Sequence, residues 1–531
     1  MDLGKMTDGY LLAIDAGTGS VRAVLFDRRG EQIGAVQREW EHRTDPRYPG
    51  SMDFDWAHNW ELASSCVRGV IEQTGIRPEE VAGVSTTCMR EGILLYDAQG
   101  QEIWACANVD SRSNDEVAML VKRDPALEKE LYAESGEAYA LGALPRLLWV
   151  KDKQPEIYEK TARVGMFNDW LIYRLTGVMP VEPSNGSTTG IFDLKKRDWD
   201  PSIAERVGLR TDIFPAVSEC GTRIAEVNGQ GAADTGLPVG TPVVVGGGDS
   251  QLGCIGVGVI DPGQAAIFGG SFWQYEFNTG IADTDPACRV RVNCHAVPGV
   301  WQYEALAFQP GLVMRWFRDG FCQREAEIAA RTGEDIYDLM NREAAKVPAG
   351  SNGMMCTFSD VMNFTCWKHA SPTFTNFSLD PAVHNRYTFY RAILENACLV
   401  TKGHVDLVRE ATGHMPEEVV FAGGASKSPL WCQILADVLG LPVRVPEVRE
   451  ATALGAAILA GTGIGMYRDI ADGVASCVRW DQTYRPDPDN HRVYEEMYGV
   501  WREIYAAQLS LSDRGLTRYM WAAPGVAKEE S

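Results

Sequence analysis

The chain has 531 residues, of which 45% are hydrophobic and 23% are charged, a composition typical of a folded globular protein. A chain of this length is expected to divide into two or more domains. The net charge of −22 argues against nucleic acid and anionic membranes as partners, because a phosphate-rich surface would repel the protein. A nucleotide bound with its metal in a local pocket is still compatible with this charge.

Cysteine spacing and the start of the chain bear on the cellular compartment. The 13 cysteines include no Cys-x-x-Cys pair, so we expect free thiols and neither a zinc site nor a disulfide framework. The sequence does not open with a basic segment and a long apolar run, so no signal peptide is expected. The uncharged stretch 451–466 is short and glycine-rich, and it predicts a buried helix and loop rather than a membrane span. These features predict a cytoplasmic protein.

The first third of the chain begins with a strand meander. Strands are expected at 10–14, 21–26 and 32–39, then a helix at 56–73 and a strand at 81–86. This order resembles the ribonuclease-H-like half of proteins in the actin, hexokinase and heat-shock ATPase superfamily.

The turn between the first two strands, Asp15-Ala16-Gly17-Thr18-Gly19-Ser20, has the clearest chemical signal. A carboxylate at a strand end, followed by small residues with free N–H groups, can receive nucleotide phosphates and hold their Mg²⁺. An ordinary hairpin turn with the same glycines is the alternative interpretation. The Walker A pattern is absent, and Arg22 stands where a dinucleotide-binding loop would have its third glycine.

The strand and glycine-turn pattern begins again in the middle of the chain. Apolar residues 242–245 lead into Gly246-Gly247-Gly248-Asp249, and residues 265–268 lead into Gly269-Gly270-Ser271. The recurrence predicts two related domains that face each other across a cleft.

Later segments continue the alternation of strands and helices. A strand at 418–421 is followed by a third glycine turn, and helices are expected at 430–438, from 450 onward and at 491–511. We therefore expect an α/β protein with two ribonuclease-H-like domains. The expected boundaries are 8–248 for the N-terminal domain, 249–465 for the C-terminal domain and 466–531 for an extension packed on the second domain.

Several motifs together resemble the FGGY family of carbohydrate kinases, of which glycerol kinase is a familiar member. In the family's order they are DAGTGSVRA, Met89-Arg90-Glu91-Gly92, Gly247-Gly248-Asp249, Gly270-Ser271, Met314-Arg315-Trp316, Gly423-Gly424-Ala425 and EATALGAA. Within the family, stretches such as CMREGILLYD, EPSNGSTTG and VVVGGGDSQLGC are similar to the autoinducer-2 kinases. That resemblance implies ATP-dependent phosphorylation of (S)-4,5-dihydroxypentane-2,3-dione, the open form of this quorum-sensing signal, at its C5 hydroxyl.

The resemblance also implies roles for residues that would contact the substrate. Asp249 is expected to be the general base that accepts the proton of the attacking hydroxyl, although a helix cap is its structural alternative. Arg90 and Glu91 suit a polyol, since one donates to oxygens and the other accepts from hydroxyls; a surface ion pair is their alternative. The expected substrate-binding residues are Arg90, Glu91, Asn108, Asp249 and Gln251. The expected Mg²⁺ ligands are Asp15 and Asp249.

The nucleotide site implied by the resemblance draws on both halves of the chain. The expected ATP-binding residues are Thr18, Gly19, Ser20, Arg22, Gly270, Ser271, Gly311, Arg315, Gly424 and Ser428. Arg315 stands where glycerol kinase has a neutral amide, and Asn108 stands where it packs an aromatic ring beside the substrate, which argues against glycerol. Trp273 and Trp316 are expected in the core rather than against the nucleotide.

Two other functions stay open. The first is an FGGY kinase for a pentulose or polyol such as xylulose or ribulose. The second is a non-catalytic regulator that binds sugar and ATP, although Asp249 argues against it because a switch needs no base beside an alcohol. By analogy with glycerol kinases, a sugar-transport phosphocarrier protein is a candidate partner, but no sequence feature identifies its surface.

Overall fold

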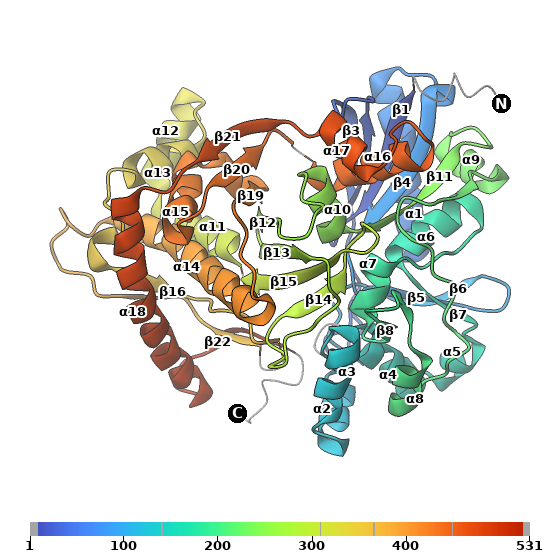
Figure 1. The fold of residues 1–531 in the computed structure, drawn as a ribbon, viewed down its shortest axis with the longest axis horizontal. Helices are drawn as coiled ribbons and strands as arrows, with labels where there is room; N and C mark the ends of the chain where they lie inside the picture. The colour runs from blue at the N-terminus through green and yellow to red at the C-terminus, as the bar shows by residue number, and fades with distance from the viewer. Residues whose placement is uncertain (1–8, 140–141, 308, 365–366, 449, 524–531) are drawn as a thin grey trace.

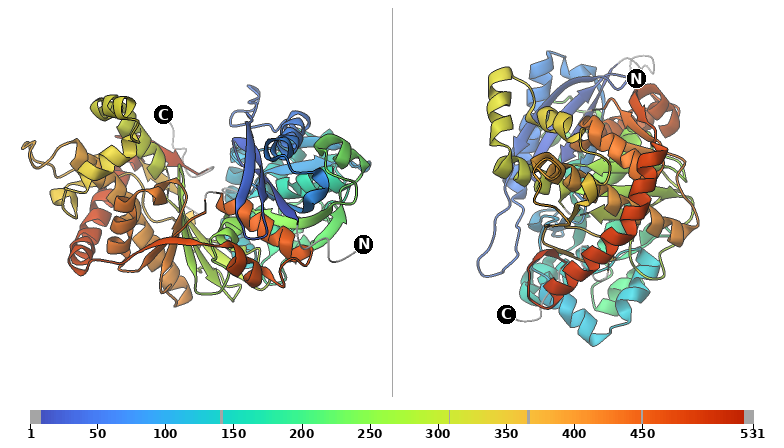
Figure 2. Two further views of the ribbon diagram at one scale, coloured as in Figure 1. Left: turned by 90° about the horizontal axis from the view of Figure 1, so that it is seen from above. Right: turned by 90° about the vertical axis from the view of Figure 1, so that its left-hand side faces the viewer.

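The computed structural model describes residues 9–139, 142–307, 309–364, 367–448 and 450–523, and these form two lobes, each built on a mixed β-sheet (Figure 1, Figure 2). The first sheet has the strand order β10-β11-β4-β1-β2-β3. Its strands are β1 (Tyr10–Ala16), β2 (Ser20–Phe26), β3 (Gln32–Glu39), β4 (Val81–Cys88), β10 (Arg223–Glu226) and β11 (Pro242–Gly248). The helices α1 (Trp56–Thr74) and α6 (Phe167–Thr176) pack on it, and α9 (Gly229–Thr235) packs on these two helices.

A smaller three-stranded sheet extends the first lobe beside the main sheet. Its strands are β5 (Ile93–Tyr96), β6 (Glu102–Cys106) and β7 (Arg163–Met166). Around it lie α2 (Asn114–Arg123), α3 (Leu127–Ser135), α4 (Ala143–Lys153), α5 (Pro155–Lys160), α7 (Pro183–Gly186), the pair β8 (Phe192–Asp193) and β9 (Asp198–Trp199), and α8 (Pro201–Val207).

The second sheet has the strand order β14-β15-β13-β12-β19-β20-β21. Its strands are β12 (Ala265–Gly269), β13 (Trp273–Thr279), β14 (Arg291–Cys294), β15 (Trp301–Ala307), β19 (Val419–Ala422), β20 (Val443–Pro446) and β21 (Trp480–Tyr484). The helices from residue 249 onward are α10 (Asp249–Gly256), α11 (Pro310–Phe321), α12 (Gln323–Thr332), α13 (Ile336–Ala344), α14 (Arg386–Thr412), α15 (Pro429–Leu439), α16 (Ala451–Gly463), α17 (Ile470–Cys477) and α18 (Pro488–Asp513). Four short strands form two separate two-stranded sheets: β16 (Met355–Thr357) with β18 (Thr373–Thr375), and β17 (Lys368–Ala370) with β22 (Tyr519–Ala522).

The two sheets share one topology. In the first, β1, β2 and β3 form an antiparallel meander, and β4 and β11 continue the sheet in parallel on the far side of β1. In the second, β12, β13 and β15 form the meander, and β19 and β20 continue in parallel beyond β12. This repetition confirms the predicted α/β class with two ribonuclease-H-like domains.

The second strand meander begins later in the chain than predicted. The strand at 242–245 does not open the second meander, because β11 pairs in parallel with β4 and completes the first sheet. A glycine allows this close pairing, since a Cβ on Gly246 would lie 1.5 Å from the Thr86 carbonyl oxygen. The second meander begins at β12 instead.

Late segments of the chain return to the first lobe. The helix α16 packs on β1, β4 and β11 (Figure 1). Its side chains form one apolar cluster with Leu11, Ala13 and Leu252. Helix α10 crosses α16 closely, because a Cβ on Gly455 would lie 1.9 Å from the Leu252 carbonyl oxygen. Residues 451–463 therefore form the predicted buried helix, but against the first sheet. By contrast, α18 packs on α15 and β16 of the second lobe.

Within the part of the chain that the structure describes, every helix is too short or too polar to span a bilayer.

Candidate active site

The ends of three neighbouring strands bring the candidate residues together. Strands β1, β4 and β11 run in parallel, and their last residues, Ala16, Cys88 and Gly248, lie side by side. Residues that follow parallel strands therefore gather at one edge of the sheet, where α/β proteins commonly bind ligands. Here they are Arg90, just beyond β4, and Asp249, the first residue of α10.

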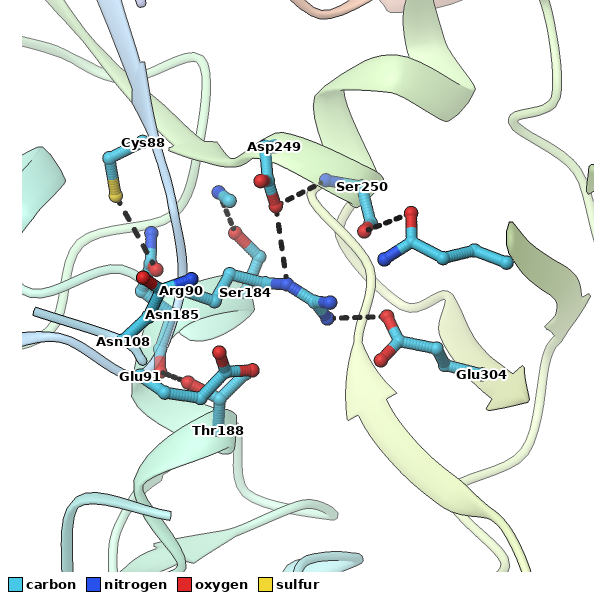
Figure 3. A network of polar contacts seen from close by, with 12 residues as sticks. Cys88, Arg90, Glu91, Asn108, Ser184, Asn185, Thr188, Asp249, Ser250 and Glu304 are labelled. Atoms are coloured by element: carbon cyan, nitrogen blue, oxygen red, sulfur yellow. Dashed lines mark hydrogen bonds and ion pairs between the residues drawn. The ribbon is translucent and has the colours of Figure 1, made fainter. Parts of the chain in front are cut away.

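Arg90 lies between two carboxylates from different parts of the chain (Figure 3). Its Nε is 3.3 Å from Oδ1 of Asp249, and its Nη1 is 2.6 Å from Oε2 of Glu304 on β15. The Arg90 side chain is only 5% exposed, and a Cβ on Gly248 would come within 2.8 Å of it. The glycine before Asp249 therefore leaves the space that the methylene groups of the Arg90 side chain occupy.

Glu91 is fixed at both its backbone and its carboxylate. Its φ of 65° lies in the left-handed region, which non-glycine residues seldom adopt except at strained functional positions. Arg146 donates a hydrogen bond to its carbonyl oxygen, and Arg291 Nη1 lies 2.9 Å from its Oε1. The side chain is thus held toward the edge where Arg90 and Asp249 lie.

The surroundings of Asp249 suit proton transfer. Burial in the site, together with the nearby charge of Glu91, raises its pKa to about 6, while Arg90 opposes the shift. The side chain is nevertheless 42% exposed, so a substrate can reach it. At neutral pH the carboxylate is mostly ionised yet more basic than an ordinary aspartate, as a general base requires.

Two further predicted substrate residues adjoin this group. Asn108 donates a hydrogen bond of 3.0 Å from Nδ2 to the Thr18 hydroxyl, which links the substrate side to the glycine turn. Gln251 is fully buried on α10, and neither its amide nitrogen nor its amide oxygen has a hydrogen-bond partner in the described part of the chain. Such a group is expected to find a partner in water or a ligand.

At the glycine turn, Asp15 forms the third acidic position. Burial raises its pKa to about 7, and the charges of Asp249 and Glu450 add to the shift while Arg22 opposes it. Arg22 lies 3.5 Å from Asp15 and 2.5 Å from Glu450. The buried carboxylate of Asp15 and the partly exposed carboxylate of Asp249 repel each other, and their hard oxygen atoms form a donor set that a divalent cation would stabilise.

A cavity of about 480 Å³ in the second lobe gathers the remaining predicted nucleotide residues. Gly311 lies so close to the loop after β12 that a Cβ would be 2.2 Å from the Gly270 carbonyl oxygen. Predicted residues that line the cavity are Gly270, Ser271, Gly311, Arg315, Gly424 and Ser428. Thr18, Gly19, Ser20 and Arg22 lie apart from it, on the turn of the first lobe.

Some site residues carry no local sequence signal. Glu304 and Arg291 contact Arg90 and Glu91, but both lie on strands whose sequences contain no recognisable motif. Glu450, which contacts Arg22, was predicted only as the first residue of the EATALGAA motif. The cavity also has polar lining residues that were not predicted: Asp335, Tyr337, Asp338, Asn341 and Lys427. One expectation about side chains was wrong: Trp273 is fully buried as expected, but Trp316 on α11 is 54% exposed.

Comparison with known proteins agrees with this geometry. Two family models match, the N-terminal domain of the FGGY family of carbohydrate kinases over residues 10–256 and its C-terminal domain over residues 279–464. The chain belongs to the FGGY family of carbohydrate kinases. It is therefore an ATP-dependent phosphotransferase.

Two kinds of relative resemble this kinase along nearly its whole length. It is 49% identical over 522 residues to the autoinducer-2 kinase of Klebsiella pneumoniae, covering 98% of both chains. It is 49% identical over 518 residues to that of Escherichia coli, covering 97% of this chain and 98% of the relative. Among solved structures, xylulose kinase from Rhodospirillum rubrum is 25% identical with a TM-score of 0.82, over 95% of this chain and all of the other. Plasmodium falciparum glycerol kinase with ADP, 18% identical, has the same fold, with a TM-score of 0.82 over 94% of this chain and 98% of the other.

Proposed function

We propose that this kinase transfers the γ-phosphoryl group of ATP to the C5 hydroxyl of (S)-4,5-dihydroxypentane-2,3-dione, the open form of autoinducer-2. The observation that carries the proposal is the 49% identity, over 98% of the chain, to a protein named autoinducer-2 kinase. The substrate edge supports it chemically, because Arg90 and Glu91 offer a cationic donor and an anionic acceptor beside the base.

In this proposal Asp249 accepts the proton of the C5 hydroxyl while the hydroxyl oxygen attacks the γ-phosphorus. A bond forms between that oxygen and phosphorus, and the bond from phosphorus to the leaving oxygen of ADP breaks. General-base assistance of this kind is worth roughly 10²–10⁴-fold in rate. Arg90 donates to the carbonyl oxygens and Glu91 accepts from a hydroxyl, so the two residues orient the substrate. Asn108 and Gln251 complete the contacts to the substrate.

The nucleotide lies between the two lobes in this proposal. Thr18, Gly19, Ser20 and Arg22 face the phosphates from the first lobe, and Gly270 and Ser271 face them from the second. Gly311, Arg315, Gly424 and Ser428 contact the adenosine. The support is that the second-lobe residues share one cavity, where a side chain on Gly311 would collide with the phosphate-side loop.

Mg²⁺ is part of the proposal, with Asp15 and Asp249 as its protein ligands. No described group of three or more His, Cys, Asp and Glu residues could enclose a metal by itself. That agrees with Mg²⁺, which proteins commonly hold through one or two carboxylates together with substrate phosphates and water. The ion would neutralise charge on the phosphates; Asp15 and Asp249 would position it.

A coupled ATP-consumption assay with the dihydroxydione, xylulose, ribulose and glycerol tests the substrate assignment. We expect kcat/KM to be highest for the dihydroxydione and mass spectrometry to find one added phosphoryl group at C5. A higher kcat/KM for a pentulose would replace the proposed substrate, and no turnover with any of these compounds would favour a regulator.

Location and protein partners are also proposals. We infer that the kinase acts in the cytoplasm, where ATP is available. A regulatory phosphocarrier protein rests on analogy with glycerol kinases, and pull-down with a purified phosphocarrier tests it.

A further inference from the structure

Two rungs of polar side chains lie across three strands of the second sheet. Cross-strand pairing aligns Arg291 of β14 with Glu304 of β15, and Glu304 with Glu276 of β13. The next rung aligns Asn293, Gln302 and Asn278 in the same way. All six side chains are at most 1% exposed. Because strand residues two positions apart share a face, the rungs form one buried polar surface on the sheet.

This polar surface contacts the substrate edge of the first lobe. Arg291 Nη1 lies 2.9 Å from both Glu91 Oε1 and Glu304 Oε1, and its Nη2 lies 2.7 Å from Oε2 of Glu137. Glu304 in turn pairs through its other oxygen with Arg90. One guanidinium therefore joins two carboxylates of the first lobe to one of the second.

Electrostatic interactions on this surface favour the ion pairs that Glu304 makes with Arg90 and Arg291. Two nearby guanidinium groups, on Arg90 and Arg291, lower the pKa of Glu304 to about 2 despite its burial. Burial, together with the nearby charge of Glu304, raises the pKa of Glu276 well above its usual range. Burial therefore favours the neutral form of Glu276, and the two guanidinium groups favour the ionised form of Glu304. Removing one partner from such a buried pair is costly, because it leaves the other charge uncompensated.

We propose that Arg291 and Glu304 are positioning residues, which hold Glu91 and Arg90 in the orientation that binds the substrate. Neither is a catalytic residue, since each acts through a residue of the first lobe. Glu91 needs such a support because its backbone is in the left-handed region and its side chain is 11% exposed at the edge of the site. Substrate affinity then depends on these two ion pairs between the lobes, whereas nucleotide affinity does not depend on them.

The test compares Arg291→Lys and Glu304→Gln with the control Arg289→Lys. Arg289 lies two residues earlier, is 32% exposed and pairs with Asp285 and Glu410, away from the site. A lysine keeps the charge of Arg291 but lacks the planar fork that contacts several carboxylates at once. We expect both site variants to raise KM for the substrate roughly 10-fold or more, with ATP affinity by calorimetry unchanged. The control should match the parent in both quantities.

Combining Arg291→Lys with Glu91→Gln separates positioning from a merely structural role. If Arg291 acts through Glu91, the double variant should have nearly the same KM as Glu91→Gln alone. Multiplying effects, an unchanged KM in folded single variants, or a parallel loss of ATP affinity would overturn the proposal. Melting curves identify any variant that fails to fold; Glu304→Gln, which is nearly isosteric, then decides the outcome.

This inference rests on the proposed roles of Arg90 and Glu91, but not on the identity of the substrate. If the parent prefers a pentulose, the same ratios are measured with that sugar, so an incorrect substrate and an incorrect positioning role give different results.

Discussion

The substrate edge and the nucleotide cavity are lined by different kinds of residue. At the substrate edge, Arg90, Arg291 and Glu304 are buried charged side chains, each paired across the boundary between the lobes. The nucleotide cavity is lined by side chains of the helices α11, α13, α14 and α15 and by the glycine turns after β12 and β19, where Gly270 and Gly424 are exposed. In the proposed function, ion-paired side chains therefore contact the small substrate, and a cavity that glycine turns help to shape receives the nucleotide. Substitutions should therefore act through charge at one end and through volume at the other.

The largest effect is expected on replacing Asp249, the proposed general base, because proton transfer is lost while the shape of the site is kept. Asp249→Asn keeps the size of the side chain but removes the proton acceptor. With saturating MgATP and substrate, kcat should fall by roughly 10²-fold or more, while the melting temperature stays near that of the parent. ATP affinity measured on the same variant separates the proton transfer from any metal role. A kcat near the parent's would mean that Asp249 only begins α10.

The next effect concerns the charge on the other side of the substrate. Glu91→Gln removes the negative charge that pairs with Arg291 and accepts from the substrate. We expect KM for the substrate to rise roughly 10- to 100-fold, as for the loss of a hydrogen bond to a charged group. Calorimetry should find ATP binding unchanged. A selective loss of ATP affinity would show that the substrate and nucleotide ends have been exchanged.

Volume should matter in the nucleotide cavity, and two glycines provide a matched pair. A Cβ on Gly311 would lie 2.2 Å from the Gly270 carbonyl oxygen, whereas a Cβ on Gly424 would have no other atom within 4 Å. Gly311→Ala should therefore displace the loop and weaken ATP binding by roughly 10-fold, and Gly424→Ala should have little effect. Equal affinities in the two variants would contradict a role for the close approach at Gly311.

The smallest effect is on stability and depends on pH. Burial raises the pKa of Asp15 to about 7 from a usual value of 3.8, so the folded protein holds this proton more tightly than the unfolded chain. Ionisation of Asp15 therefore destabilises the fold increasingly as pH rises from about 4 through 7. Without nucleotide, Asp15→Asn should melt at nearly the parent's temperature at about pH 5 and a few degrees higher at about pH 8.

The same variant should lose the stabilisation that MgATP gives the parent. A variant that melts below the parent at both pH values would contradict the burial cost of Asp15. Normal activity at limiting Mg²⁺ would contradict its role as a metal ligand.

The sequence predicts those features whose signal is local. Strands β1, β2 and β3 follow from apolar runs separated by turn residues, and the structure extends the first of them by only a few residues to Ala16. Motif order also brings together residues that are distant along the chain, such as Gly270 and Gly424, which line one cavity. Asp249 lies beside Arg90 as the motifs imply.

What could not be predicted depends on contacts between distant segments. Arg291 and Glu304 alternate with apolar residues, as a strand with one solvated face would, and only cross-strand pairing reveals that this polar face is buried. β11 was misplaced because an apolar strand before a glycine turn is compatible with either sheet. Trp316 was expected in the core on residue type alone, yet it is 54% exposed at its position on α11.

The return of α16 to the first sheet has a consequence for the protein during its synthesis. Leu11, Ala13, Val24 and Phe26 are made long before the helix that covers them, which ends at Gly463. At typical rates of translation, roughly 10 to 40 s pass between completion of α10 and completion of α16. During that interval one apolar face of the first sheet lacks the helix that covers it, and such exposed surface makes a nascent chain prone to aggregate.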